Sequence, residues 1–230
     1  CQERLAQEDM SVRGIMRASG VKLVCTTDDP VDGLFWHRVL AEDEEMDITV
    51  LPTWRPDRAL SIEKPDFADY MRQLSDVSGI AVKSFDDWKA ALSSRMDYFA
   101  RMGCLISDHG LLYVPWAPAD GAEAGKIFLA GLQGEQISRE EELKFKTEAL
   151  LWLGREYEKR GWAMQLHFGV TRDNNTRMYR ELGPDTGFDG IYNRVPMTEL
   201  SAFLDALCQE HALPKTVLYS LNPEDNAALG

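Results

Sequence analysis

Residues 161–189 read GWAMQLHFGVTRDNNTRMYRELGPDTGFD and combine one short apolar run with two polar loops. The apolar run, 162–168, has glycines on both sides, and its length and flanks are typical of a buried strand. A dense polar segment follows at 172–177, and a second polar loop covers 183–189. Two guanidinium groups and several amides in so short a segment predict a binding surface for an anionic, hydroxyl-rich ligand.

Four more short apolar runs alternate with helical patterns along the chain. Such alternation is typical of βα units around a parallel sheet. No G-x-G-x-x-G loop follows the first run, which argues against a doubly wound dinucleotide-binding sheet. The predicted strands are residues 21–25, 47–51, 103–106, 162–168 and 215–221. The predicted helices are residues 5–19, 31–40, 138–160, 176–181 and 198–211, with a long helical region at 66–102.

A polar cluster follows each predicted strand at once: TTDDP, TWRPD, SDHG, RDNNTR and NPED. In a parallel barrel such clusters all lie on the rim formed by the carboxyl ends of the strands, where active sites are built. The sequence therefore predicts an α/β fold, a (β/α)8 TIM-type barrel of which about five βα units are present. We expect residues 1–230 to form one partial barrel domain of the metal-dependent-hydrolase type, with a helical insertion around 66–102.

The ends of two helices carry clear signals. Ser84 and Ser138 are predicted N-caps, because acidic residues follow each of them within the first helical turn. In the first helix, 5–19, the predicted inward positions are Met10, Val12, Ile15 and Met16.

The charge and the cysteines limit the class of protein. A formal net charge of −13 disfavours binding to nucleic acid or to an anionic membrane. The four cysteines, Cys1, Cys25, Cys104 and Cys208, form no C-x-x-C pair, so we expect reduced, mostly buried thiols in a cytoplasmic protein. The first residues contain no initiator Met and no signal peptide, and we expect the chain to begin partway through a longer protein.

Several short motifs of the sequence resemble those of one enzyme family. QLHFG, NNTRM and LGPDTGFD, together with TTDDPVD and PTWRPD, are similar to the middle part of uronate (glucuronate) isomerases of the amidohydrolase superfamily. The resemblance implies an aldose–ketose isomerase of glucuronate catabolism. Its reactions convert D-glucuronate to D-fructuronate and D-galacturonate to D-tagaturonate through an enediol(ate). It also implies a divalent metal, zinc, whose main ligands, an H-x-H pair and a late Asp, are expected outside this segment.

An isomerase of this kind needs a base near C2, polarisation of the two reacting oxygens and a clamp for the distal carboxylate. His167, at a strand end, is the candidate metal ligand and catalytic contact, although it could instead cap a backbone carbonyl. Arg55 is the candidate carboxylate clamp, and an ion pair with Asp57 or Asp29 is the alternative. Arg177 ranks second for the clamp, and Arg172 is interpreted as solvated.

The remaining site candidates are less distinctive. Asp108 and His109 suggest a catalytic dyad, and a loop-anchoring hydrogen bond explains them equally well. Trp54, Asn175 and Asp29 are candidate substrate contacts, with turn chemistry as the alternative for the last two. The helical residues His37 and His211 are interpreted as surface or helix-end histidines.

Two other functions stay open from the sequence. One is a metal-dependent hydrolase of the same superfamily. The other is a catalytically inactive fragment, because no H-x-H strand and no last strands are present. The open strand edges of such a fragment would need the missing strands or a second copy of the chain as cover, so a homo-oligomer is one expected assembly.

Overall fold

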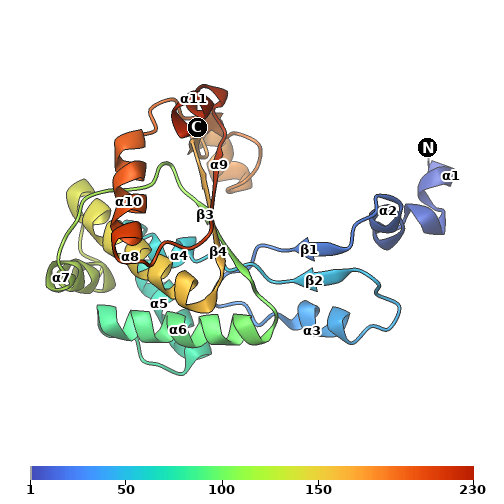
Figure 1. Cartoon of the computed structure of the whole chain (residues 1–230), viewed down its shortest axis with the longest axis horizontal. Coiled ribbons are helices and arrows are strands. Elements are labelled where there is room, and N and C mark those ends of the chain that lie inside the picture. Colours follow the sequence, from blue (N-terminus) through green and yellow to red (C-terminus); the bar gives the residue numbers. More distant parts are fainter. Residues whose placement is uncertain (1) are drawn as a thin grey trace.

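Five parallel strands form the framework of the chain in the computed structural model, which describes residues 2–230 (Figure 1). Cys1, whose thiol was predicted to be reduced, lies outside the described residues. Of the described cysteines only Cys104 is buried, while Cys25 and Cys208 are exposed, so the prediction of mostly buried thiols is wrong. Each strand leads into a loop or helix before the next one begins, as βα units require. The strands are β1 (Leu23–Cys25), β2 (Thr49–Leu51), β3 (Ile106–Gly110), β4 (Ala163–Phe168) and β7 (Thr216–Ser220).

The five strands lie side by side in chain order. β1 pairs with β2, and β3, β4 and β7 form a second parallel sheet in that order. Trp54 joins the two sheets, because it forms parallel bridges to Asp28 on one side and to Ser107 on the other. The prediction of an α/β chain with parallel strands is confirmed. In the described part of the chain, β1 and β7 are the two outer strands of this row.

Helices α5 to α8 pack around one hydrophobic core beside the strands (Figure 1). Aromatic side chains of these helices meet there, with ring centroids 5.2–6.2 Å apart for Phe67, Phe85, Trp88, Phe128 and Phe145. The helices are α1 (Gln2–Leu5), α2 (Val12–Ala18), α3 (Phe35–Ala41), α4 (Asp57–Leu60), α5 (Phe67–Ser78), α6 (Phe85–Arg101), α7 (Gly121–Leu132), α8 (Arg139–Arg160), α9 (Thr176–Leu182), α10 (Met197–Gln209) and α11 (Asn226–Leu229), with 3-10 turns at Glu8–Met10 and Pro223–Asp225.

The two predicted N-caps are confirmed. The side chain of Ser84 accepts a hydrogen bond from the backbone N–H of Asp87, and Ser138 forms a reciprocal capping box with Glu141. The long α8 then ends at Gly161, which adopts the left-handed conformation at φ 66°. These signals fix where α8 ends and where β4 can begin.

The first predicted helix, 5–19, is wrong as a single element. It divides into α1, a 3-10 turn and α2, because Ser11 accepts a hydrogen bond from Gly14 N and starts a new helix. Val12 and Ile15, predicted to face inward, are 76% and 45% exposed. Their segment belongs to an arm with β1 and β2 that extends away from the helical body (Figure 1).

Two further predictions need correction. The third strand runs from Ile106 to Gly110, so the polar cluster SDHG lies inside the strand and does not follow it. Partners from other segments, Tyr157 for His109 and both Arg55 and His167 for Asp108, make this possible. His37 is buried, and its Nε2 lies 2.7 Å from Thr26 Oγ1, so it is not a surface histidine.

Alternation along the strands separates two faces. On β4 the even-numbered residues Met164, Leu166 and Phe168 are buried against helices, and the odd-numbered ones are partly exposed. The second set belongs to what we name the open face. Its side chains, matched by strand register and contacts, are Leu23, Cys25, Arg55, Asp108, Gln165, His167, Val217 and Tyr219.

Candidate active site

Three side chains meet at the carboxyl ends of neighbouring strands on the open face. Asp108 is their centre. Its Oδ1 lies 2.5 Å from His167 Nδ1, and its Oδ2 lies 3.3 Å from Arg55 Nη1. The His167 ring also stacks on Tyr219, with centroids 4.2 Å apart and an interplanar angle of 5°. A carboxylate that holds one imidazole nitrogen fixes the ring and directs Nε2 outward.

These residues line a small cavity of about 180 Å³. Arg172, which follows the short strand β5 (Val170–Thr171), also contributes to its wall. β5 pairs antiparallel with β6 (Gly190–Ile191), and Arg172 Nη1 lies 2.8 Å from Asp189 Oδ2 and 3.4 Å from Asp185 Oδ1. The cavity therefore carries two guanidinium groups, which suits a carboxylate ligand.

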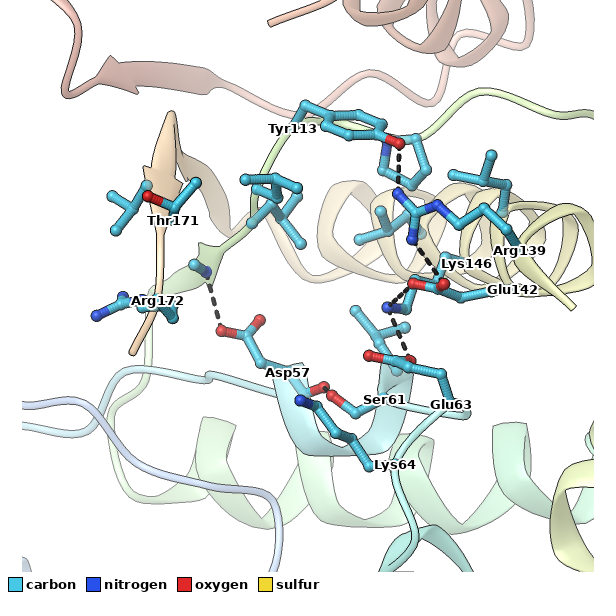
Figure 2. Close-up of a pocket in the computed structure, with 18 of the residues that line it drawn as sticks. Asp57, Ser61, Glu63, Lys64, Tyr113, Arg139, Glu142, Lys146, Thr171 and Arg172 are labelled. Carbon is cyan, nitrogen blue, oxygen red and sulfur yellow. Dashed lines mark hydrogen bonds and ion pairs between the residues drawn. The ribbon is translucent and has the colours of Figure 1, made fainter. Parts of the chain in front are cut away.

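A wider cleft of about 570 Å³ adjoins this cavity through Gly110, Leu111, Val170 and Arg172 (Figure 2). Its far wall consists of paired charges. Lys146 lies 2.6 Å from Glu142 and 2.9 Å from Glu63, while Arg139 pairs with Glu142 and with the Tyr113 hydroxyl. The four charges of this wall therefore neutralise one another.

Arg55 is held by a second carboxylate. Its Nε donates to Asp57 Oδ2 at 2.9 Å. Burial alone would lower the pKa of Arg55, but the hydrogen bond to Asp57 and the charges of Asp57 and Asp108 outweigh burial and raise this pKa. Burial alone would raise the pKa of Asp57, and the opposing effects of His109 and Arg55 lower it. Both groups are therefore charged at neutral pH, as the ion-pair alternative for Arg55 required.

The predicted dyad of Asp108 and His109 is wrong. Adjacent strand residues point to opposite faces, so His109 is fully buried on the helix side while Asp108 faces the cavity. His109 Nε2 lies 3.0 Å from the Tyr157 hydroxyl, and its Nδ1 lies 3.4 Å from Asp57 Oδ1. The carboxylate–imidazole pair of the cavity is instead Asp108 with His167, which are 59 residues apart.

Trp54 does not reach the cavity, which corrects its assignment as a substrate contact. Its side chain is fully buried, because position 54 points to the helix side of its strand. The ring makes an edge contact with Phe99 at 5.0 Å and lies 6.3 Å from Trp162.

The α9 candidates also lie outside both cavities. The Arg177 side chain is 80% exposed, with Glu181 3.9 Å away as its ion-pair partner. Asn175 is the N-cap of α9 and accepts from Met178 N, as the turn alternative predicted.

Asp29 occupies a turn beside a separate cavity of about 270 Å³, which Arg55 and Asp57 also line. It accepts hydrogen bonds from Val31 N at 3.0 Å and from the Tyr70 hydroxyl at 2.8 Å. Burial raises the pKa of Asp29. The turn chemistry accounts for this residue, and its role as a substrate contact stays a prediction.

Two site residues were missed by sequence reasoning. Arg172 was interpreted as solvated, although it lies only five residues after His167 and so close to the strand end. Asp57 belongs to the motif PTWRPD but was considered only as a structural ion-pair partner of Arg55. In both cases the position just after a predicted strand was the available signal.

The described residues contain no group of three or more His, Cys, Asp or Glu side chains that could hold a metal ion. His167 nevertheless fits one ligand of such a site, since Asp108 occupies its Nδ1 and Nε2 stays available. No helix of the described chain is long and apolar enough to cross a membrane.

Comparison with known proteins shows the family to which the chain is similar. The glucuronate isomerase family model matches residues 1–230. The uronate isomerases of Lachnoclostridium phytofermentans and Lachnospira eligens are 50% and 51% identical over 230 residues, which are 100% of this chain and 49% of each relative. The chain thus spans about half the length of the curated relatives it matches.

Two solved structures of the same family also match this chain over about half of their own length. The crystal structure of uronate isomerase from Thermotoga maritima matches with a TM-score of 0.89 and 32% identity, over 94% of this chain and 48% of that one. Glucuronate isomerase from Caulobacter crescentus matches with a TM-score of 0.87 over 97% of this chain and 46% of that one. At 23% identity the second match shows a shared fold.

Proposed function

The chain belongs to the glucuronate isomerase family, and we propose that it supplies part of the active site of an aldose–ketose isomerase for hexuronates. The reaction we propose interconverts D-glucuronate and D-fructuronate, and D-galacturonate and D-tagaturonate. The observation that carries this proposal is the cluster of Arg55, Asp108 and His167 at the ends of three neighbouring parallel strands. Its chemistry suits a small sugar acid with one carboxylate and several hydroxyls.

We propose that the strands are half of a TIM-type barrel, which a longer protein completes. Their parallel order supports this, and so does the open face, where Leu23, Val217 and Tyr219 are 50%, 42% and 40% exposed. A closed barrel fills its interior with such side chains. Residues 1–230 would then be one partial domain, with α5 and α6 as the helical insertion.

In the mechanism, Arg55 binds the substrate carboxylate through its free N–H groups, and Arg172 adds charge from the other side of the cavity. Asp108 orients His167, whose Nε2 is directed at the reacting hydroxyls; there its one lone pair either accepts a proton from a hydroxyl or would be a ligand of the metal. A divalent metal, zinc in our proposal, supplies polarisation of the reacting oxygens when bound, and His167 is the residue of this chain that would face it. The general base for C2 is not assigned to a residue of this chain.

Of the two other functions that the sequence left open, the hydrolase has no support from the relatives described above, which are uronate isomerases. The cytoplasmic location and self-association stay predictions.

The test uses the natural gene product that contains this chain, assayed for ketose formation from D-glucuronate. Arg55→Lys is the informative variant, because lysine cannot reproduce a bidentate guanidinium contact. We expect kcat/KM to fall about 10- to 100-fold, because this is the factor that corresponds to the loss of one hydrogen bond to a charged group. Arg177→Lys is the matched control and leaves kcat/KM unchanged. Wild-type activity in Arg55→Lys would refute the assigned clamp, and a wild-type product without ketose would refute the isomerase.

A further inference from the structure

Asp57 supports Arg55 from behind. As the first residue of α4, it places Oδ2 where two donors converge: Arg55 Nε and the backbone N–H of Gly110, each at 2.9 Å. Gly110 is the last residue of β3, so one carboxylate oxygen ties the Arg55 side chain to the end of the neighbouring strand.

The other oxygen of Asp57 faces the core. Oδ1 is buried and lies 3.4 Å from His109 Nδ1, and neither atom has a hydrogen-bond partner among the described residues, so this approach is an electrostatic contact between two otherwise unpartnered buried groups. His109 is in turn fixed by the hydroxyl of the fully buried Tyr157 on α8. A line of polar contacts therefore runs from the helix layer, through His109 and Asp57, to the guanidinium at the cavity.

This line has a geometric consequence for Arg55. A guanidinium is planar with five N–H donors in a fixed fork, so fixing Nε fixes the direction of the other donors. With Nε on Asp57 and Nη1 near Asp108, the remaining N–H bonds have a defined direction. A long arginine side chain without such a support would lose more conformational freedom when it binds a ligand.

We propose that Asp57 and His109 are positioning residues, which hold the Arg55 guanidinium in the orientation that binds the substrate carboxylate. This inference rests on the proposed function, because it assigns that carboxylate to Arg55. It replaces the catalytic role predicted for His109, which is buried away from the cavity. It also differs from a purely structural ion pair, which would affect stability and leave ligand affinity unchanged.

The test is a double-mutant cycle in the natural gene product, with Asp57→Asn, Arg55→Lys and the double variant. The readouts are the Kd for D-glucuronate by calorimetry, kcat and KM, and the Tm. We expect Asp57→Asn to raise Kd and KM about tenfold with a smaller change in kcat, and the double variant to bind no worse than Arg55→Lys alone. Glu210→Gln, which removes the carboxylate of the exposed pair with Arg155 at 2.6 Å, is the matched control and leaves Kd unchanged.

Each failure has its own signature. If Arg55→Lys binds D-glucuronate like the wild type, the proposed clamp is wrong and this inference falls with it. If Arg55→Lys weakens binding but Asp57→Asn changes only the Tm, or the two effects on Kd add, positioning through Asp57 is overturned alone. Should Asp57→Asn fail to fold, His109→Gln tests the same support from the core side, and an unchanged Kd in that variant overturns the proposal.

Discussion

Gly110→Ala displaces Arg55 without changing any charge of the site. A Cβ at position 110 would lie 2.1 Å from Arg55 Nη2, whereas ordinary van der Waals contact begins at 3.4 Å. The guanidinium must therefore retreat by about 1.3 Å, the difference between these distances, and this breaks its 2.9 Å bond to Asp57 or its 3.3 Å approach to Asp108. A misplacement of about 1 Å can cost roughly 100-fold in rate, so we expect kcat/KM for D-glucuronate to fall about 100-fold.

The assay is ketose formation with calorimetric binding of D-glucuronate, on the natural gene product. Gly154→Ala is the matched control, because its Cβ would lie 2.7 Å from Leu207 Cδ1 in the core between α8 and α10. Overpacking of this kind costs about 1–3 kcal/mol of stability, so the control lowers the Tm and keeps the affinity. Wild-type affinity in Gly110→Ala would show that the guanidinium does not bind the substrate from the position described, and would refute the reasoning.

Three further predictions concern stability and thiol chemistry. Ser138→Ala removes the capping box of α8 and should lower the free energy of unfolding by about 1 kcal/mol, measured by urea denaturation, with Glu141→Gln as a milder companion. Burial raises the pKa of the Cys104 thiol to about 12 from 9.0, so above pH 9 the unfolded chain releases a proton that the folded protein retains. The free energy of unfolding then falls between pH 9 and 12, and Cys104→Ala should reduce this slope, while the buried Tyr70 and Tyr157, whose pKa values are also raised, keep a slope of the same sign above pH 10. At pH 8 a thiol reagent should modify the exposed Cys25 and Cys208 of the isolated chain before Cys104, and rapid labelling of Cys104 in the native state would contradict its burial.

The strands could be predicted because their signals are local. The run 162–168 has glycine at both ends, and the structure places β4 at Ala163–Phe168. The third strand was predicted a few residues too early, at 103–106, because the polar segment SDHG was interpreted as a loop. Asp108 and His109 are tolerated inside β3 only because each meets a partner from another segment, and such partners are invisible to a local pattern.

The site could be predicted only in part, for the same reason. Position near a predicted strand end singled out Arg55, Asp108 and His167 as site candidates, and the structure brings their side chains together, although Asp108 lies within β3. The prediction paired Asp108 with His109 because they are adjacent in sequence. Side chains alternate along a strand, so these two point to opposite faces, and Asp108 contacts His167 instead. The NNTRM motif favoured Arg177 over Arg172 as a second clamp. In the structure Arg172 follows the antiparallel pair β5–β6 and lines the cavity, whereas Arg177 lies on α9 and is exposed.

The support for Arg55 and the enclosure of the substrate have different origins in the fold. Asp57, His109 and Tyr157 all belong to this chain. The contacts that link Arg55 to Asp57, Asp57 to His109 and His109 to Tyr157 are therefore all made within residues 2–230. The orientation of Arg55 therefore does not require the rest of a barrel. The open face, by contrast, exposes Tyr219 next to His167 and Val217 next to Gln165. A site open on that side leaves a charged ligand in water, where its attraction to Arg55 is weak. The isolated chain should consequently hold Arg55 in place yet bind D-glucuronate far more weakly than the natural gene product. Equal affinity of the two proteins would mean that these five strands alone enclose the ligand.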